Sequence, residues 1–226
     1  MMSPQRTTST PHGSLFQVSD EWNRTHFYPL VKRSLDIIAS MILLILLAPL
    51  MGIVALLIKL TDEGSIIFSQ IRVGKDGRRF RCFKFRSMIT NAEPLKAKLM
   101  AQNKHADSKT FKIANDPRIT WIGRLIRKTS IDELPQLVNV LLGDMSLVGP
   151  RPPVPTEVEQ YSPYELRRLE VKPGLTCIWQ VSGRADLGFD QQVKLDLEYI
   201  STQGVWLDLK LLVLTVPAVI SGKGAY

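Results

Sequence analysis

The chain has 226 residues, a length typical of one folded domain or of one domain with an appended tail. Apolar residues make up 45% of the composition and charged residues 22%, which excludes a wholly disordered chain and allows a real core. The 29 Lys and Arg residues outnumber the 21 Asp and Glu residues, and the net charge of +8 favours an anionic partner: nucleic acid, an anionic bilayer surface or a phosphorylated substrate.

The chain is expected to begin with a disordered tail over residues 1–27. Its first residues, MMSPQRTTSTPHGS, are rich in Ser, Thr and Pro and contain almost no residues that build a core. They also lack the apolar stretch of a secretory signal, so we do not interpret them as one.

An uncharged run from Ile37 to Ile58 is the strongest local signal in the sequence. As a helix this run would be about 33 Å long, close to the thickness of the hydrocarbon layer of a membrane. A soluble core helix of this length that is apolar on every side is rare. Residues 28–60 are therefore predicted to enter a membrane.

Two topologies remain open for this segment. Lys32 and Arg33 precede the run and Lys59 ends it, which favours both flanks on the cytoplasmic side. Pro49, near the middle, deletes one helix hydrogen bond and permits a sharp bend. A re-entrant helix–break–helix satisfies both observations, whereas a kinked helix that crosses the membrane once is the alternative.

A β-hairpin is predicted next, because residues 66–73 and 79–86 alternate between apolar and polar around the turn sequence GKDG. Its strands are unusually basic, and the second carries Lys84 and Arg86. Such a face suits lipid phosphates or the phosphate of a substrate, although a solvated charged face is the ordinary interpretation.

The remaining elements are predicted to be mostly helical. Residues 91–112 are polar and rich in Lys, which indicates a helix followed by a mobile loop, and helices are expected over 134–142, 164–170 and 190–200. The apolar stretch 208–220 is too short to span a membrane and is interrupted by Pro217. It is either an interfacial helix or a buried core helix.

The densest group of reactive residues lies in 119–153, where Asp132 and Glu133 are adjacent. Ser130 and Glu133 fit a capping box, which would make the two acids structural. Pro135 favours a second interpretation, because it disfavours a helical Leu134 and prefers the first helical position. Both carboxylates would then stay anionic just outside a positive helix end, suited to nucleophilic attack or Mg²⁺ binding.

Several arginines and one further acidic pair are weaker candidates. Arg151 lies between two prolines that restrict its backbone, which suits a bidentate phosphate contact. Arg184, in the sequence SGR, gives a weaker signal, and Asp196 and Glu198 are expected to be solvated. The chain contains no Walker loop, no G-x-G-x-x-G after a strand and no G-x-S-x-G elbow.

The two cysteines and three histidines follow no metal-binding spacing, so no zinc site is expected. Two free thiols are typical of a reducing compartment, which places most of the chain in the cytosol.

The motifs together resemble the monotopic phosphoglycosyl transferases, bacterial sugar transferases that begin exopolysaccharide, capsule or glycan assembly. The matching segments run in order over residues 32–226: KRSLDII before the apolar run, FKFRSM, IGRLIRKTSIDELPQLVNVLLGDMSLVGPRP, VKPGLTCIWQVSGR and the final GAY. The chain departs from the usual pattern of this family at Trp121, Leu142 and Cys177. These departures bear on individual substrate contacts rather than on the reaction.

The resemblance implies an α-rich α+β fold, in which a re-entrant helix, amphipathic interfacial helices and a small β-hairpin surround a cytosolic active site. Residues 61–226 would form the catalytic domain at the inner membrane. Pro49 would mark the membrane break, Asp132 would be the nucleophile, and Glu133 its partner at Mg²⁺. The residues expected to bind substrate phosphates are Lys84, Arg86, Arg127, Arg151 and Arg184.

The expected reaction moves a hexose 1-phosphate from a UDP-sugar onto polyprenyl (undecaprenyl) phosphate, and the GAY ending favours glucose or galactose. Membrane lipids are expected partners and nucleic acid is not, while a homo-oligomer remains open. The alternatives are a membrane-anchored basic protein that binds anionic lipid or nucleic acid, and a phosphatase acting on lipid diphosphates.

Overall fold

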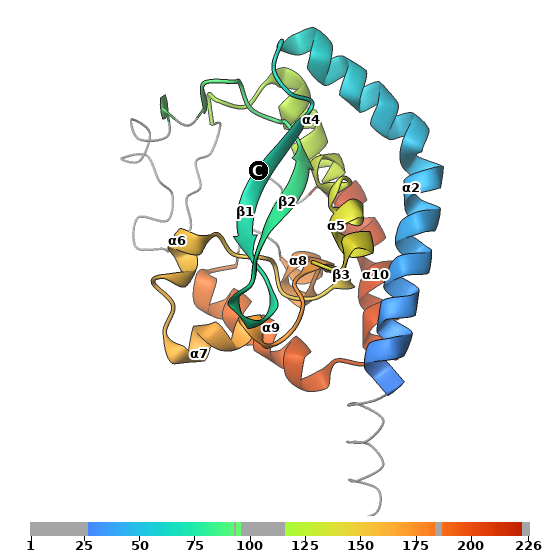
Figure 1. Cartoon of the computed structure of the whole chain (residues 1–226), viewed down its shortest axis with the longest axis vertical. Helices are drawn as coiled ribbons and strands as arrows, with labels where there is room; N and C mark the ends of the chain where they lie inside the picture. Colours follow the sequence, from blue (N-terminus) through green and yellow to red (C-terminus); the bar gives the residue numbers. More distant parts are fainter. Residues whose placement is uncertain (1–26, 93, 96–115, 184–186, 223–226) are drawn as a thin grey trace, which may run out of the picture.

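A computed structural model describes residues 27–222, apart from 93, 96–115 and 184–186 (Figure 1). Residues 1–26 of the predicted tail, most of the polar segment 91–112 and Arg184 therefore lie outside the described residues.

The long apolar segment forms one helix, α2 (Tyr28–Thr61), of 34 residues. It continues through Pro49, so the predicted break is not an interruption of the helix. Proline keeps a helical backbone angle and removes only one hydrogen bond, and the flanking turns hold the helix together. In Figure 1 the helix curves over the rest of the chain. Only 11% of its most apolar stretch is buried, whereas the core helix of a soluble protein is mostly buried.

The first turns of α2 are fixed to the rest of the protein by polar contacts. Arg33 donates to the carbonyls of Val140 and Leu141 at 2.6 and 2.8 Å. Asp36, which is buried, accepts from the Ser146 hydroxyl at 3.0 Å and from the Leu147 amide at 2.9 Å. The helix therefore belongs to the folded domain as well as to the predicted membrane segment.

The predicted hairpin is confirmed. Strand β1 (Ile67–Val73) pairs antiparallel with β2 (Arg79–Phe85) across a short 3-10 turn, η2 (Lys75–Gly77). Asp76 and Gly77 both have positive φ in this turn, a conformation that Asp and Gly tolerate better than most residues. Cys82 and Phe85 of β2 are buried.

The segment around the acidic pair folds as α4 (Trp121–Lys128), the 3-10 turn η4 (Ile131–Glu133) and α5 (Gln136–Leu142). Ser130 has φ 55° and makes no capping bond, so the capping-box interpretation is wrong. The α-helix begins at Gln136, one residue after the position that the alternative predicted, and Pro135 is its N-cap. Leu134 is nevertheless helical, contrary to expectation, because its amide closes the 3-10 turn onto the carbonyl of Ile131 at 3.1 Å.

A second, parallel strand pair was not predicted. Strand β3 (Ser146–Val148) pairs with β4 (Gly174–Thr176) deep in the protein. A Cβ on Gly174 would lie 2.1 Å from the amide nitrogen of Gly149, so only glycine allows this approach. The pair brings the segment before Arg151 against the last three residues of VKPGLT.

The C-terminal half is mostly helical, as predicted. It comprises α6 (Pro155–Val158), α7 (Pro163–Leu166), η5 (Arg167–Glu170), α8 (Ile178–Ser182), α9 (Phe189–Thr202) and α10 (Val205–Ser221). Asp196 of α9 is fully buried beside Arg168 rather than solvated, which corrects the expectation for that acid. Helix α10 is partly buried, since Leu211 is buried and Val213 is 70% exposed, so the segment 208–220 is not a fully buried core helix. Its place at a membrane interface stays a prediction.

The main core lies between the hairpin, α5, the β3–β4 pair and α10, and its buried members are Cys82, Leu137, Val140, Met145, Leu147, Val148, Tyr199 and Leu211. A smaller cluster beneath the second half of α2 consists of Val54, Ile58, Phe85, Ile122 and Ile126. The described fold is thus α-rich with a small hairpin, as predicted.

Candidate active site

The adjacent acids Asp132 and Glu133 lie in η4, between the end of α4 and the start of α5. The left-handed backbone at Ser130 turns the chain after α4, and Pro135 delays the start of α5. The carboxylates are therefore placed before the amino-terminal end of α5, where the helix dipole favours negative charge. Asp132 is only 8% exposed.

Lys84 of the hairpin contacts this acidic pair. Its Nζ lies 2.6 Å from Glu133 Oε1 and 4.0 Å from Asp132 Oδ2. Lys84 forms a hydrogen bond with Glu133 and interacts with Asp132 only at longer range. Lys84, which was predicted to bind substrate phosphate, thus interacts with the two candidate acids in this structure.

Two arginines that were predicted to bind phosphate also lie near the acidic pair. Arg151 Nη1 lies 3.8 Å from Glu133 Oε1, and the side chain remains 42% exposed. Arg127, on the last turn of α4, is close enough to Asp132 for each to shift the pKa of the other. Excess positive charge beside two acids is an arrangement that can hold further anions, such as phosphate groups.

Burial and charge shift the two carboxyl groups in opposite directions. Burial raises the pKa of Asp132 to about 6, with Lys84 opposing this rise and Glu133 adding to it. Burial acts on Glu133 too, but Lys84 and Arg151 outweigh it and hold the pKa of Glu133 at about 2. Both carboxyl groups are thus ionised at neutral pH, and on acidification Asp132 takes up a proton at a higher pH than Glu133 does.

These groups line a cavity of about 1620 Å³. Further walls come from α2 and α10, and its charged lining comprises Arg72, Lys84, Arg86, Asp116, Arg118, Arg127, Asp132, Glu133, Arg151, Glu157 and Arg168. The candidate catalytic residues therefore face a space that is large enough for a substrate and reaches the apolar helices.

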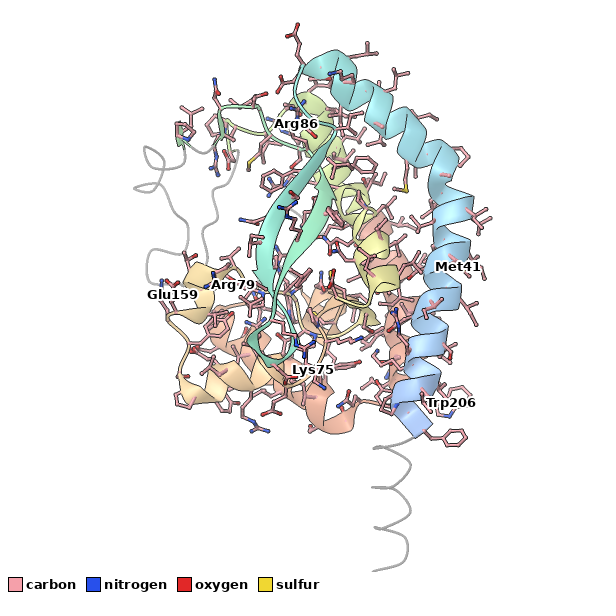
Figure 2. All side chains as sticks on the ribbon, in the orientation of Figure 1. Met41, Lys75, Arg79, Arg86, Glu159 and Trp206 are labelled. Atoms are coloured by element: carbon pink, nitrogen blue, oxygen red, sulfur yellow. The ribbon has the colours of Figure 1, made fainter. Side chains whose placement is uncertain are left out.

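One predicted phosphate ligand, Arg86, contacts another acid instead. Arg86, labelled at one end of the hairpin in Figure 2, donates to the Asp62 carbonyl at 2.9 Å and lies 3.8 Å from the Asp62 carboxylate. It lines the cavity but is engaged by the loop after α2. Arg184 lies outside the described residues.

The structure also brings residues to the site that were not singled out from the sequence. Arg72 of β1 donates to the Pro152 carbonyl at 2.9 Å and so supports the turn that carries Arg151. Arg118 pairs with Asp116 at 2.6 Å on the cavity wall. The only sequence signal for Arg72 was its place in the basic hairpin, because its partner lies 80 positions away.

Comparison with known proteins supports a relationship over nearly the whole described chain. Residues 27–222 match the family described as bacterial sugar transferase. The chain is 50% identical over 200 residues to the galactosyl transferase CpsE of Streptococcus agalactiae serotype III (strain NEM316), covering 87% of this chain and 43% of that protein.

This chain covers very different shares of two further relatives. The undecaprenyl-phosphate galactose phosphotransferase of Salmonella typhimurium (strain LT2) is 47% identical over 200 residues, which are 87% of this chain and 42% of that protein. The exopolysaccharide production protein ExoY of Rhizobium meliloti (strain 1021) is 36% identical over 230 residues, 100% of each. The chain thus spans less than half of the first two relatives and the whole of the third, and it belongs to the bacterial sugar transferase family.

Proposed function

We propose that this protein transfers a sugar 1-phosphate from a UDP-sugar onto polyprenyl phosphate, with release of UMP. The observation that carries the proposal is the buried Asp132 beside Glu133, faced by Lys84, Arg127 and Arg151 in a cavity that also has apolar walls. Relatives with names such as undecaprenyl-phosphate galactose phosphotransferase and UDP-glucose:undecaprenyl-phosphate glucose-1-phosphate transferase support the same reaction.

The proposed reaction has two displacements. A carboxylate oxygen of Asp132 attacks the phosphorus that bears the sugar, and the bond from this phosphorus to the oxygen of UMP breaks. A phosphate oxygen of the lipid then attacks the same phosphorus, which restores the Asp132 carboxylate and yields a sugar diphosphate lipid. Dividing the exchange in this way lets one site receive two anionic substrates in turn.

The cations have separate roles in this scheme. Lys84 and Arg127 lower the pKa of Asp132 against the effect of burial, and so keep the nucleophile ionised at neutral pH. Arg151, with a partly exposed side chain, is available to contact the phosphoryl group and to stabilise charge as it transfers. Arg72 holds the carbonyl after Arg151 and orients that turn.

Mg²⁺ is the proposed cofactor, held by Glu133 with Asp132 nearby. The part of the chain that the structure describes contains no group of three or more metal-ligating side chains. Two carboxylates nevertheless fit Mg²⁺, because this ion commonly takes one or two protein carboxylates and completes its shell with water and substrate phosphates. When bound it would neutralise charge on the diphosphate of the nucleotide sugar.

We also propose that α2 re-enters the cytoplasmic membrane and that the catalytic domain faces the cytosol. The basic residues at both ends of α2 and its curved course support this topology. Single cysteines placed at Phe27 and Glu63 should both react with an impermeant maleimide in inverted membrane vesicles. Reaction of the two positions from opposite faces would make α2 a spanning helix.

A panel of UDP-sugars tests the reaction itself. The purified protein, given polyprenyl phosphate and Mg²⁺, should release UMP with UDP-glucose or UDP-galactose, and Asp132→Asn should abolish the release. A protein that instead binds anionic lipid or nucleic acid with equal strength in both forms, and releases no UMP, would be a basic binding protein rather than this enzyme.

A further inference from the structure

Two helices present apolar stripes to the cavity that holds Asp132. From α2 these residues are Ala39, Ile42, Leu43, Leu47 and Leu50, and from α10 they are Leu212, Val216, Ala218, Val219 and Ile220. The α2 residues follow helical spacing and form one continuous face, as do Leu212, Val216 and Val219 of α10. Ala218 and Ile220 widen the α10 lining near the end of that helix. Helix α10 is tied to the site by a hydrogen bond of 2.7 Å between Thr215 and Thr176 of β4.

These apolar walls are partly uncovered. Ile42 is 51% exposed, Val216 is 59% exposed and Ile220 is 80% exposed. The outer faces of the same helices are exposed as well, and Figure 2 labels Met41 and Trp206 at that edge of the molecule. The walls therefore lie between the predicted membrane surface and the charged part of the cavity.

The size of the cavity exceeds what one nucleotide sugar needs. Pockets for small ligands measure roughly 300–1,000 Å³, whereas this cavity measures about 1620 Å³. The additional space is bounded by apolar helices and is continuous with Lys84, Arg127 and Arg151. A ligand with an anionic head and a hydrocarbon tail matches both the charge and the polarity of this space.

We propose that the groove between α2 and α10 holds the hydrocarbon chain of the lipid acceptor, and guides its phosphate to Asp132. This inference rests on the proposed function and adds the route of the second substrate. Pro49 and Pro217 lie inside these two helices, and each removes one backbone hydrogen bond from its helix. The nucleotide sugar would use the opposite, polar part of the cavity.

Two matched pairs of tryptophan variants test the proposal. Val216→Trp and Ile42→Trp fill the groove, whereas Val213→Trp and Ile45→Trp place the same side chain three residues away, at exposed positions that do not line the cavity. UMP release is measured with UDP-sugar alone, with long-chain polyprenyl phosphate and with geranyl phosphate. The release without lipid reports the nucleotide-sugar half of the reaction and the integrity of the fold.

The groove variants should raise the KM for long-chain polyprenyl phosphate by about tenfold or more. They should affect geranyl phosphate less and leave UMP release without lipid unchanged, and the two control variants should resemble wild type in all assays.

Equal effects of groove and control variants, or no effect, would overturn the proposal and make these faces contacts for bulk lipid. Loss of lipid-independent UMP release in the groove variants alone would assign the groove to the nucleotide sugar. If the wild type releases no UMP from any UDP-sugar, the proposed function itself fails.

Discussion

Lys84 lies 2.6 Å from Glu133 but 4.0 Å from Asp132, so one lysine interacts unequally with two adjacent carboxylates. Glu133, which takes the closer contact, has the lower pKa, while Asp132 keeps a pKa of about 6. This asymmetry gives neighbouring acids of one dipeptide different chemistry. Glu133 suits a permanently anionic metal ligand, and Asp132 suits a more basic nucleophile that is still ionised at neutral pH.

The first prediction concerns pH. Since Asp132 must be ionised to attack, UMP release in a single turnover should fall as the pH drops through about 6. Lys84→Met removes the main opposing charge, so the acid limb of this profile should move to higher pH. Lys75→Met, in the exposed hairpin turn, is the control and should leave the limb in place. An unchanged limb in Lys84→Met would show that another group controls it.

The second prediction concerns the effect of the buried Asp132 carboxylate on the free energy of unfolding. Burial raises the pKa of Asp132 from 3.8 to about 6 in the folded state. The contribution of Asp132 to stability is therefore full below pH 3.8 and is lost as the pH rises through 6. Asp132→Asn should increase the free energy of unfolding at pH 7.5, by at most about 3 kcal/mol.

Denaturant titrations at several pH values measure this effect, and the gain should vanish near pH 4. Glu133→Gln provides a comparison of opposite sign. The pKa of Glu133 falls from 4.5 to about 2, so its contribution is present above 4.5 and lost as the pH falls through 2. Loss of stability in Asp132→Asn at pH 7.5 would contradict the account of its burial.

The third prediction concerns the contact between α2 and the site. Asp36 accepts two hydrogen bonds from β3, which leads directly to the turn bearing Arg151. Asp36→Ala leaves both buried donors unpaired and should lower kcat by about tenfold or more while the protein stays in the membrane fraction. Asp190→Ala, at an exposed position, is the control. Full activity of Asp36→Ala would show that α2 is only an anchor.

The fourth prediction compares two ion pairs in the same region. Asp196 is fully buried and lies 2.7 Å from Arg168, whereas Glu170 pairs with Arg167 at the surface at 3.1 Å. Asp196→Ala leaves a buried guanidinium uncompensated and should cost about 3–5 kcal/mol of folding stability. Glu170→Ala should cost less than about 1 kcal/mol. Thermal and denaturant unfolding distinguish the two, and equal losses would contradict the difference in burial.

Local patterns in the sequence were sufficient for part of the structure. The hairpin follows from alternation around GKDG, and α2 follows from its uncharged run. The geometry of proline placed the start of α5 to within one residue, at Pro135 rather than Gln136. In each of these cases the determining residues lie close together in the chain.

Other features depend on partners far apart in the chain, which no local pattern encodes. The three-residue strands β3 and β4 are set by pairing across about 28 positions, and their segments are too short for a periodic signal. Arg168 and Asp196 are also 28 positions apart, so Asp196 resembled a solvated helical acid. The continuity of α2 through Pro49 depends on the helical turns on either side of it, which the proline alone does not specify.

The covalent intermediate is the central claim, and its direct test is the intact mass of the protein. Incubation with Mg²⁺ and a productive UDP-sugar, without lipid, should release UMP and add the mass of one phosphosugar, located on Asp132 by peptide mapping. Adding polyprenyl phosphate should then remove the adduct. If UMP forms only when lipid is present, and no adduct is found on Asp132, the lipid phosphate attacks the nucleotide sugar directly and Asp132 is not the nucleophile.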